Sequence, residues 1–539
     1  MAEPVFSKPP PSGDHEPPPK PKRYWWRFTL GSMVIVIAVA VATSASILLY
    51  IGSIATALSH HNAYNSKLHR YLAQVHGGEP ENILILGSDK RANLQEDPGR
   101  SDTTILLRLD PDRNAIAVMS IPRDLKVEIP GFGTEKFNAA YTYGGPKLTL
   151  QVVKELTGLP INHVVNVDFL GFVRAVDAIG CVYTDVDRRY YHSNAGVPAS
   201  EQYSEINIKP GYQLLCGKRA LEYVRYRHTD TDIVRSARQQ DFLSAARERV
   251  PVSKLVLGQN DLVDIFTKYT TSDISDTETM LQVMKLFIAS RNAAIKEIHF
   301  PAELGPSYVY ASESAIHGAV NKFLGIEASG GPRGSLDEGR SSSSGGGRRR
   351  KSRERAEPKP HIAKPKPPGS DGLVPAREAG ELEAKTVARK VSAGFPVFYP
   401  TRLPSGASYV ESNSYEHIQD PRVYHLRDTE NHRHGAYRMV AELPLSDGIH
   451  YFGMQGIQGW SDPPILANAS LTKTINGREY EIYVDGDRVS LVAWHRGNSS
   501  YWVSNDLLNT LTNDQMVGIA RSASVKMPNP KPKRGKAKR

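Results

Sequence analysis

The chain has 539 residues, of which 40% are hydrophobic and 23% are charged, and its formal net charge is +10 at pH 7. Two low-complexity segments hold this charge: residues 333–366 contain 11 basic and 4 acidic residues, and residues 526–539 contain 7 basic and no acidic ones. The rest of the chain is slightly acidic, which excludes a fold that is basic throughout, and we expect no nucleic-acid partner. The length indicates more than one domain.

The N-terminal segment has the pattern of a membrane anchor. Residues 1–27 are rich in proline and predict a disordered cytoplasmic tail. Residues 28–50 form an uncharged, mostly apolar run of 23 residues, which is long enough for a transmembrane helix. Lys20, Lys22 and Arg23 precede this run, so the positive-inside rule favours a cytoplasmic N-terminus. We predict a single-pass protein of the cell membrane, with a stalk over residues 51–79 and all later residues extracytoplasmic; a cleaved signal peptide is the alternative.

Residues 80–325 alternate between strand and helix patterns. Short β-rich runs bounded by turn residues predict strands over residues 82–87, 103–109 and 115–120. The spacing of Leu148, Val152 and Leu156 predicts a helix that ends at Gly158, and further helices are predicted over residues 217–224 and after Arg235. The predicted fold class is α/β, with a mixed sheet flanked by helices.

The C-terminal part reads as a linker followed by a second domain. Residues 326–388 are rich in Ser, Gly, Arg and Pro and predict a disordered linker. Residues 389–525 predict a small α+β accessory domain with a hairpin turn at Asp485–Asp487 and a helix over Leu507–Ser522, before a basic tail over residues 526–539. Because the linker is long, we expect this domain to move independently of the first, and a chain ending near Gly325 to keep any activity.

Charged residues gather where the predicted strands begin or end. LGSDKR contains Asp89 and Arg91, GRSDTT contains Arg100 and Asp102, and SIPRD contains Arg123 and Asp124. Side chains at the strand ends of an α/β sheet commonly face one crevice. Carboxylates that hold a hard cation, beside arginines that neutralise phosphate oxygens, are the minimal set for a magnesium-bound diphosphate.

A second charged stretch, RYRHTDTDIVRSARQ, covers residues 225–239. Its polar members are Arg225, Arg227, Asp230, Asp232, Arg235, Arg238 and Gln239. Arginine makes bidentate contacts to phosphate, so we interpret this stretch as part of a phosphate site. A salt-bridge network inside a structural core is the alternative. There is no GxxxxGK[ST] loop for a P-loop nucleotide hydrolase and no GxSxG elbow for a serine hydrolase.

These motifs together resemble one family. The series LGSDKR, GRSDTTILL, SIPRDLKVEIPG, EKFNAAYTYGGP, VDFLGFVRAVDAIG, PGYQLLCGKRALEYVRYRHTD and VRSARQQDFL is similar to the LytR-CpsA-Psr family over about residues 80–250. The resemblance implies a membrane-anchored phosphotransferase. Its substrate would be a glycopolymer on a polyprenyl-diphosphate carrier, its acceptor peptidoglycan through a phosphodiester bond, and its cofactor Mg²⁺.

The resemblance also implies roles for residues of this chain. It assigns metal binding to Asp89 and Asp102, catalysis to Arg123, Arg225, Arg227, Arg235 and Gln239, and substrate binding to Arg91, Arg100, Lys136, Asp232 and Arg238. The chain reads DIVR where many members read DFGR, which leaves the local turn open. Either Asp102 or Asp89 is a candidate for taking the acceptor's proton. The apolar residues Val164, Phe169, Phe172 and Val173 are candidates for a lipid groove, although core packing is the commoner role for any single one of them.

Two other functional classes stay open: a polyprenyl-diphosphate pyrophosphatase, which is also a possible side activity, and a non-enzymatic regulator of the cell envelope. Cys181 and Cys216 are the only cysteines. They stand where the family usually has glycine and a small polar residue. An extracytoplasmic location permits a disulfide between them, with two free buried thiols as the alternative.

Overall fold

The computed structural model describes residues 68–74, 78–88, 99, 101–196, 198, 204–226, 230–249, 270–274, 278–279, 282–283, 285–286, 293–327, 329–333, 371–410 and 422–528. All of them belong to the second of two compact units, Ile54–Arg539. Among these residues, no helix is both long and apolar enough to cross a membrane. The predicted cytoplasmic tail and transmembrane helix lie outside the described residues.

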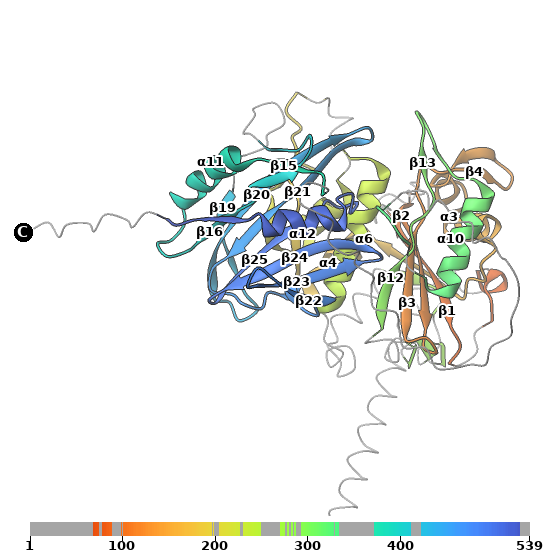
Figure 1. The fold of residues 1–539 in the computed structure, drawn as a ribbon. Coiled ribbons are helices and arrows are strands. Elements are labelled where there is room, and N and C mark those ends of the chain that lie inside the picture. The colour runs from red at the N-terminus through yellow and green to blue at the C-terminus, as the bar shows by residue number, and fades with distance from the viewer. Residues whose placement is uncertain are drawn as a thin grey trace, which may run out of the picture. The chain divides into compact units, whose positions relative to one another are not determined.

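The first half of the described chain is built on a six-stranded mixed sheet (Figure 1). Its strands, in spatial order, are β11 (Thr270–Ser272), β6 (His163–Asp168), β1 (Glu81–Ser88), β2 (Ser101–Asp110), β3 (Ala115–Ser120) and β12 (Ala294–Glu297). β2 is antiparallel to both β1 and β3, whereas β6 and β12 run parallel to their neighbours β1 and β3. The predicted mixed sheet and its first three strands are confirmed.

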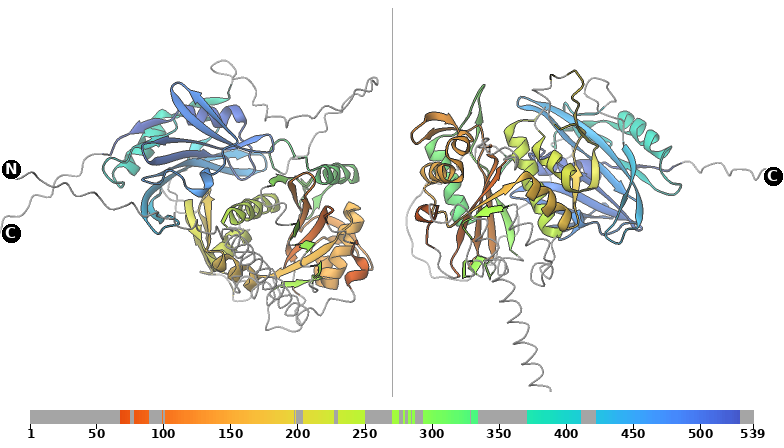
Figure 2. Two further views of the ribbon diagram at one scale, coloured as in Figure 1. Left: turned by 90° about the horizontal axis from the view of Figure 1, so that it is seen from below. Right: turned by 180° about the vertical axis from the view of Figure 1, so that it is seen from behind.

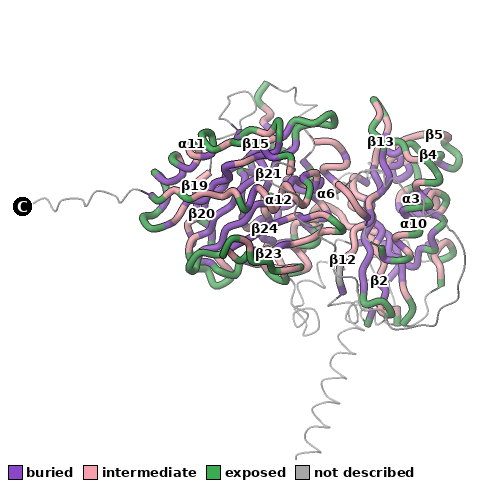
Figure 3. Tube along the Cα trace, viewed as in Figure 1, coloured by how far each residue is buried: buried purple, intermediate pink, exposed green. Residues whose placement is uncertain are grey.

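Successive side chains of a strand point to opposite faces of the sheet, and apolar residues occupy both positions here, so both faces are apolar. Helices α3 (Ala139–Thr157) and α10 (Glu313–Gly325) cover one face, where Leu84 and Leu106 share a core with Val152. Ile83 and Ile105 belong to a separate core on the other face. Figure 3 shows the strands as mostly buried and the exposed residues at turns and outer helix faces. Gly158 ends α3 at φ 66°, a left-handed conformation in which glycine carries no Cβ penalty.

A lobe of residues 169–249 stands beside the sheet with its own core. It consists of α4 (Phe169–Ala178), β7 (Val182–Val186), β8 (Tyr190–His192), β9 (Ile206–Ile208), β10 (Gly211–Leu215), α5 (Gly217–Arg225) and α6 (Asp232–Arg249). Tyr190 and Tyr223 meet in this core with ring centroids 5.3 Å apart. This lobe carries the charged stretch predicted from the sequence.

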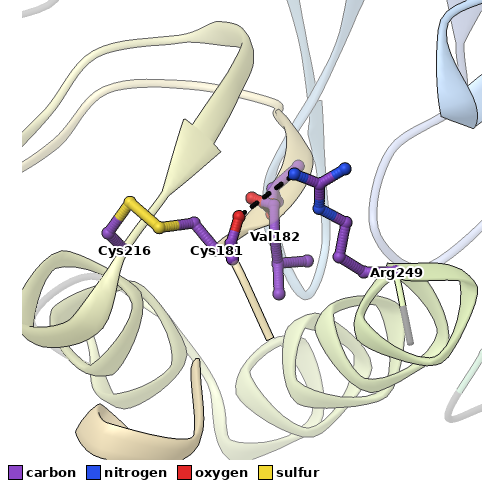
Figure 4. The surroundings of a disulfide bond; sticks show 6 residues. Cys181, Val182, Cys216 and Arg249 are labelled. Carbon is purple, nitrogen blue, oxygen red and sulfur yellow. Dashed lines mark hydrogen bonds between the residues drawn. A yellow bond between two sulfur atoms is a disulfide. The ribbon is translucent and has the colours of Figure 1, made fainter. Parts of the chain in front are cut away.

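A disulfide between Cys181 and Cys216 joins the start of β7 to the start of α5 (Figure 4). The predicted pairing is confirmed, and it closes a loop with a sequence separation of 35. Arg249, in the last turn of α6, donates to the Gly180 carbonyl at 3.2 Å, next to the disulfide. The bond therefore lies where α4, α5 and α6 are all tied together.

Residues 371–410 and 422–528 contain a second, antiparallel sheet of eight strands, in the part of the chain drawn from teal to blue in Figure 2. Its strands are β18 (Ser408–Tyr409), β19 (Arg422–Arg427), β20 (Arg433–Leu445), β21 (Gly448–Ile457), β25 (Ser499–Ser504), β24 (Arg488–Arg496), β23 (Arg478–Asp485) and β22 (Leu471–Ile475). The predicted hairpin turn at Asp485–Asp487 joins β23 to β24. The predicted closing helix is α12 (Asn513–Arg521), which begins later than expected because Thr512 and Gln515 form a capping box.

Shorter elements complete the structure. They are the 3₁₀ turns η1 (His69–Tyr71) and η2 (Pro464–Leu466), the hairpin of β4 (Lys126–Ile129) and β5 (Gly133–Lys136), the pair β13 (Glu303–Leu304) and β14 (Val309–Tyr310), and β15 (Leu373–Pro375), α11 (Arg377–Ala388), β16 (Val397–Tyr399), β17 (Arg402–Pro404) and β26 (Ser524–Lys526).

Three predicted boundaries are wrong. Leu68 is 3% exposed in the sheet's core and Lys154 donates to the Tyr71 carbonyl at 2.7 Å, so the end of the predicted stalk belongs to the first domain. β15 and α11 lie inside the predicted disordered linker, because their apolar residues pack on the second sheet. Lys526 pairs with Val397 in a two-stranded sheet and is therefore not part of a tail.

The C-terminal sheet also packs directly on the lobe, contrary to the predicted independence of the second domain. Asp185 on β7 accepts hydrogen bonds from Trp502 at 3.1 Å and from the fully buried Arg438 at 3.1 Å. Tyr424 donates to the carbonyl of Tyr212 on β10 at 3.0 Å. A long linker does not by itself make a domain mobile, because buried polar contacts of this kind can hold the domain in place.

Candidate functional site

Arg123 is the centre of a charged cluster at the edge of the first sheet. Its Nη1 donates to the carboxylate of Asp102 at the start of β2, and its backbone N–H donates to Asp232 Oδ2 at 3.1 Å. Its Nε lies 3.6 Å from Asp124 and 3.8 Å from Asp232. The structure therefore brings together the SIPRD arginine, the GRSDTT aspartate and the first residue of α6, as the strand-end argument predicts.

Asp232 and Arg235 form an ion pair within the first turn of α6, and both are almost fully buried. Burial raises the pKa of Asp232 against the opposing charges of Arg235 and Arg123. Burial lowers the pKa of Arg235, although the negative charge of Asp232 acts to raise it. The chain's DIVR sequence still begins the helix normally, because the Arg235 N–H donates to the Thr231 carbonyl at 3.1 Å. The DIVR sequence therefore places Asp232 and Arg235 in the same first turn of α6.

Two buried donors at this cluster have no hydrogen-bond partner among the described residues. They are the Nε atoms of Arg235 and of Arg123, although Arg123 Nε still lies at ion-pair distance from Asp124 and Asp232. A buried donor without an acceptor costs about 1–3 kcal/mol, so such groups are usually completed by a ligand or by water. Guanidinium donors of this kind suit the oxygens of a phosphate.

One further cationic group contacts the cluster, and a second lies at the end of α5. Lys136, on β5, donates to Asp124 Oδ1 at 3.1 Å, and both residues line a cavity of about 340 Å³ together with Arg123. Arg225 ends α5 as an exposed residue, and its guanidinium lies 3.8 Å from the ring centroid of Phe169 at the start of α4. The negative face of the ring attracts the guanidinium at this position.

Gln239 holds the elements of the site together. Its Nε2 donates to Thr103 Oγ1 at 3.0 Å and to the Val224 carbonyl at 3.1 Å, which links α6 to β2 and to the end of α5. The resemblance predicts a catalytic role for Gln239, whereas its donors are occupied by these structural bonds. Gln239 contacts Thr103 and Val224, which are the chain neighbours of Asp102 and Arg225, and in this way positions those two residues.

Arg238 is predicted to bind substrate, but its burial contradicts this role. Its side chain is fully buried, donates to the carbonyls of Tyr223 at 3.1 Å and Tyr226 at 2.9 Å, and pairs with Asp230. Asp230 also pairs with Arg188. A guanidinium enclosed in this way stabilises the lobe and is not accessible to a ligand.

Part of the predicted site lies outside the residues that the structure describes. Asp89, Arg91, Arg100 and Arg227 lie outside them. Of the apolar groove candidates, Val164 belongs to the sheet's core and Phe172 packs on the lobe's core, so neither faces a groove. Among the described residues, one group of three side chains has potential metal-ligand atoms close together: Asp177, Cys181 and Cys216. The two cysteines are joined in the disulfide.

The sequence did not indicate the roles of two charged residues that the structure makes important. Asp124 follows Arg123 in the SIPRD motif, and its pairing with Lys136 was visible only as two charges in neighbouring segments. Arg333 lies in the basic low-complexity segment and is nevertheless buried among carboxylates. No local pattern distinguishes it from the other arginines of that segment.

Arginines and carboxylates converge at the strand ends of a mixed α/β sheet, an arrangement whose guanidinium donors suit the oxygens of a phosphate. A sequence profile of the LytR_cpsA_psr family matches residues 47–322. This chain belongs to that family.

Named relatives have been assigned cell-wall functions. The chain is 30% identical over 284 residues to the polyisoprenyl-teichoic acid–peptidoglycan teichoic acid transferase TagU of Oceanobacillus iheyensis, which covers 50% of this chain and 84% of that protein. It is 32% identical over 190 residues to the corresponding transferase TagT of Bacillus subtilis, covering 35% of this chain and 58% of TagT. A solved structure of B. subtilis TagV aligns over 46% of this chain and 98% of the TagV chain, with 25% sequence identity and a TM-score of 0.38.

Proposed function

We propose that this protein transfers a cell-wall glycopolymer from a polyprenyl-diphosphate carrier to peptidoglycan, forming a phosphodiester bond. The observation that carries the proposal is the Arg123 cluster, in which buried guanidinium groups meet carboxylates at the strand ends. The family membership and the named activities of the TagU and TagT relatives support the substrate class.

The chain's own residues have distinct parts in this reaction. A sugar hydroxyl of the acceptor attacks the carrier-distal phosphorus, the new P–O bond forms, and polyprenyl phosphate leaves with the electron pair of the broken P–O bond. Arg123 and Arg225 stabilise the negative charge that grows on the phosphate oxygens. Arg235 acts through Asp232, which fixes the backbone of Arg123.

We propose that a magnesium ion binds beside Asp102. Asp102 is a hard oxygen donor at a strand end, and its side chain is 18% exposed, so an ion can reach it. Asp102 would hold the ion together with Asp89, which lies outside the described residues. When bound, magnesium neutralises phosphate oxygens as a Lewis acid. Asp102 and Asp89 are also the proposed acceptors of the hydroxyl proton.

The proposed location is the outer side of the cell membrane, with residues 28–50 as a single-pass anchor. The apolar run of that segment and the basic residues before it support this arrangement. A membrane-bound carrier lipid would then meet a site tethered to the same membrane. Phe169, which is only partly buried at the start of α4 beside Arg225, is a proposed contact for the lipid.

The test is a reconstituted transfer reaction. The purified full chain is incubated with a glycan-bearing polyprenyl diphosphate, magnesium and a peptidoglycan acceptor, and the product is analysed by ³¹P NMR and mass spectrometry. A phosphodiester-linked glycan on the acceptor supports the proposal. Hydrolysed carrier without linked product identifies a pyrophosphatase, and intact carrier under all conditions leaves the regulator as the remaining class.

A further inference from the structure

Arg333 joins three separate elements of the structure. Its Nη1 lies 2.7 Å from Asp241 on α6, and its Nη2 lies 3.0 Å from Glu297 on β12 and 2.9 Å from Asp485 at the end of β23. Its side chain is 10% exposed. Burial alone would lower the pKa of Arg333, but the three carboxylates raise it well above its ordinary value, so the guanidinium stays charged.

The chain around Arg333 is held from both sides. The Ser329 N–H donates to the Glu297 carbonyl at 3.1 Å, on the side of the first sheet. On the other side, the Gly331 N–H donates to Asp487 at 2.7 Å and the Arg333 N–H donates to the Leu508 carbonyl at 2.6 Å. Residues 329–333 are therefore a strap that runs between the family domain and the C-terminal sheet.

Three consecutive residues of α6 anchor that helix in three directions. Gln239 donates to Thr103 on β2, Gln240 donates to Ser120 on β3 at 3.0 Å, and Asp241 pairs with Arg333. Successive residues of an α-helix point about 100° apart, so these contacts together fix the rotation of α6 about its axis. The same helix presents Asp232 and Arg235 to the phosphate site, about two turns earlier.

We propose that Arg333 is a positioning residue for the reaction and that the C-terminal sheet takes part in catalysis through it. This inference rests on the proposed function of the Arg123 cluster. Asp485 holds Arg333 from the C-terminal sheet, Arg333 holds Asp241, and Asp241 sets the orientation of the helix that carries Asp232 and Arg235. No residue of the C-terminal sheet needs to touch the substrate for this coupling to operate.

The first test is Asp485→Asn, which weakens the link to the C-terminal sheet and leaves Arg333 paired with Asp241 and Glu297. We expect kcat to fall by about threefold to thirtyfold, the usual range for coupling through a packed element, while KM for the lipid diphosphate and the melting temperature change little. Glu479→Gln is the matched control, because Glu479 is an exposed carboxylate on the same strand. It should leave kcat unchanged.

The second test is Arg333→Met, which removes the charge but keeps much of the side-chain volume. We expect a fall in kcat of about 100-fold, as small displacements of catalytic groups can produce. This variant leaves three carboxylates facing one another, so its folding is checked by circular dichroism. If it does not fold, Asp485→Asn decides the question. An unchanged kcat in folded Asp485→Asn overturns the proposal.

Hydrogen exchange separates this inference from the proposed function. The amides of α6 should exchange faster in Asp485→Asn than in Glu479→Gln, whether or not the wild type transfers a glycopolymer. A wild type without turnover but with faster α6 exchange in Asp485→Asn contradicts the proposed function and retains the coupling. Equal exchange in the two variants overturns the coupling, even where the wild type is fully active.

Discussion

Arg123 contacts a carboxylate from each of three segments, which makes it the single residue on which the candidate site most depends. Its partners Asp102, Asp124 and Asp232 come from the start of β2, the turn between β3 and β4, and the start of α6. The site is therefore assembled by pairing opposite charges across elements, and each carboxylate is compensated by the same guanidinium. Removing that one side chain leaves three acidic groups without their shared partner.

We predict that Arg123→Ala lowers turnover of a lipid diphosphate by about 10²–10³-fold, the usual effect of removing one preorganised donor from a transition state. The measurement is the steady-state rate with the purified full chain and magnesium. Arg174→Ala is the control, because Arg174 is an exposed arginine on α4. Equal rates for the two variants would show that the cluster is structural.

His163 illustrates a residue whose charge matters to stability. Its Nδ1 lies 2.7 Å from Asp273 and its Nε2 lies 3.3 Å from Glu81, and the side chain is 2% exposed. Burial by itself lowers the pKa of His163, but the two carboxylates outweigh it and raise the pKa to about 9. The folded state therefore binds a proton that the unfolded state releases near the ordinary pKa of 6.5.

From this shift we predict that the stabilisation by His163 is complete below about pH 6.5 and is lost as the pH rises through about 9. It is worth at most about 3 kcal/mol. The measurement is urea unfolding between pH 6 and 10 for the wild type and His163→Gln. The difference in unfolding free energy should shrink with rising pH. His317→Gln, at an exposed position of α10, should show no such trend.

At the scale of elements, α6 is the part of the fold that connects the site with everything around it. It presents the site residues in its first turns, packs Phe242 in the lobe's core and reaches the disulfide region through Arg249. The disulfide holds the start of α5, which packs beside α6 and ends at Arg225. The orientation of the site's cations therefore depends on the integrity of the lobe.

We predict that the double variant Cys181→Ser/Cys216→Ser lowers the unfolding free energy by about 3–4 kcal/mol, the value expected for closing a loop of this length. Urea unfolding without reductant measures the effect. The wild type treated with dithiothreitol should unfold at the same urea concentration as the variant, and the untreated, denatured wild type should show no free thiol. Two titratable thiols in that sample would contradict the bond.

At the scale of the whole molecule, the C-terminal sheet is part of one compact unit with the family domain. Arg438 and Trp502 both pair with Asp185, and Arg333 closes a second contact region. The family profile ends at residue 322, so these contacts lie between the family domain and a part of the chain beyond it. Such buried polar contacts make the two parts mutually dependent.

We therefore predict that a chain ending at Gly325 loses stability, contrary to the expectation from the sequence that it would keep its activity. The truncation uncovers Tyr183 and Tyr212, which are 5% and 1% exposed in the full chain, and leaves Asp185 without partners. Each uncovered large side chain costs roughly 1.5–3 kcal/mol. Size-exclusion chromatography and thermal melting measure the effect, and a chain ending at Pro528 is the control. A soluble, active chain ending at Gly325 would restore the original expectation.

The sequence by itself determined the features that depend on neighbouring residues. Short β-rich runs bounded by turn residues predicted β1 to β3, the helical spacing before Gly158 predicted α3, and the turn residues at Asp485–Asp487 predicted a hairpin, because these signals depend on the local backbone. The motif order also identified Arg123, Asp102 and Asp232 as one site. Two cysteines in a predicted external domain were enough to predict their bond.

Only the tertiary structure decided what each charge does. Arg238 and Arg235 lie three residues apart on one helix, yet the first is enclosed by backbone carbonyls and the second holds an aspartate at the site. Arg333 belongs to a segment whose composition predicts disorder, and it is buried because carboxylates from three distant elements surround it. Burial and pairing depend on residues far apart in the chain, and local composition carries no record of them.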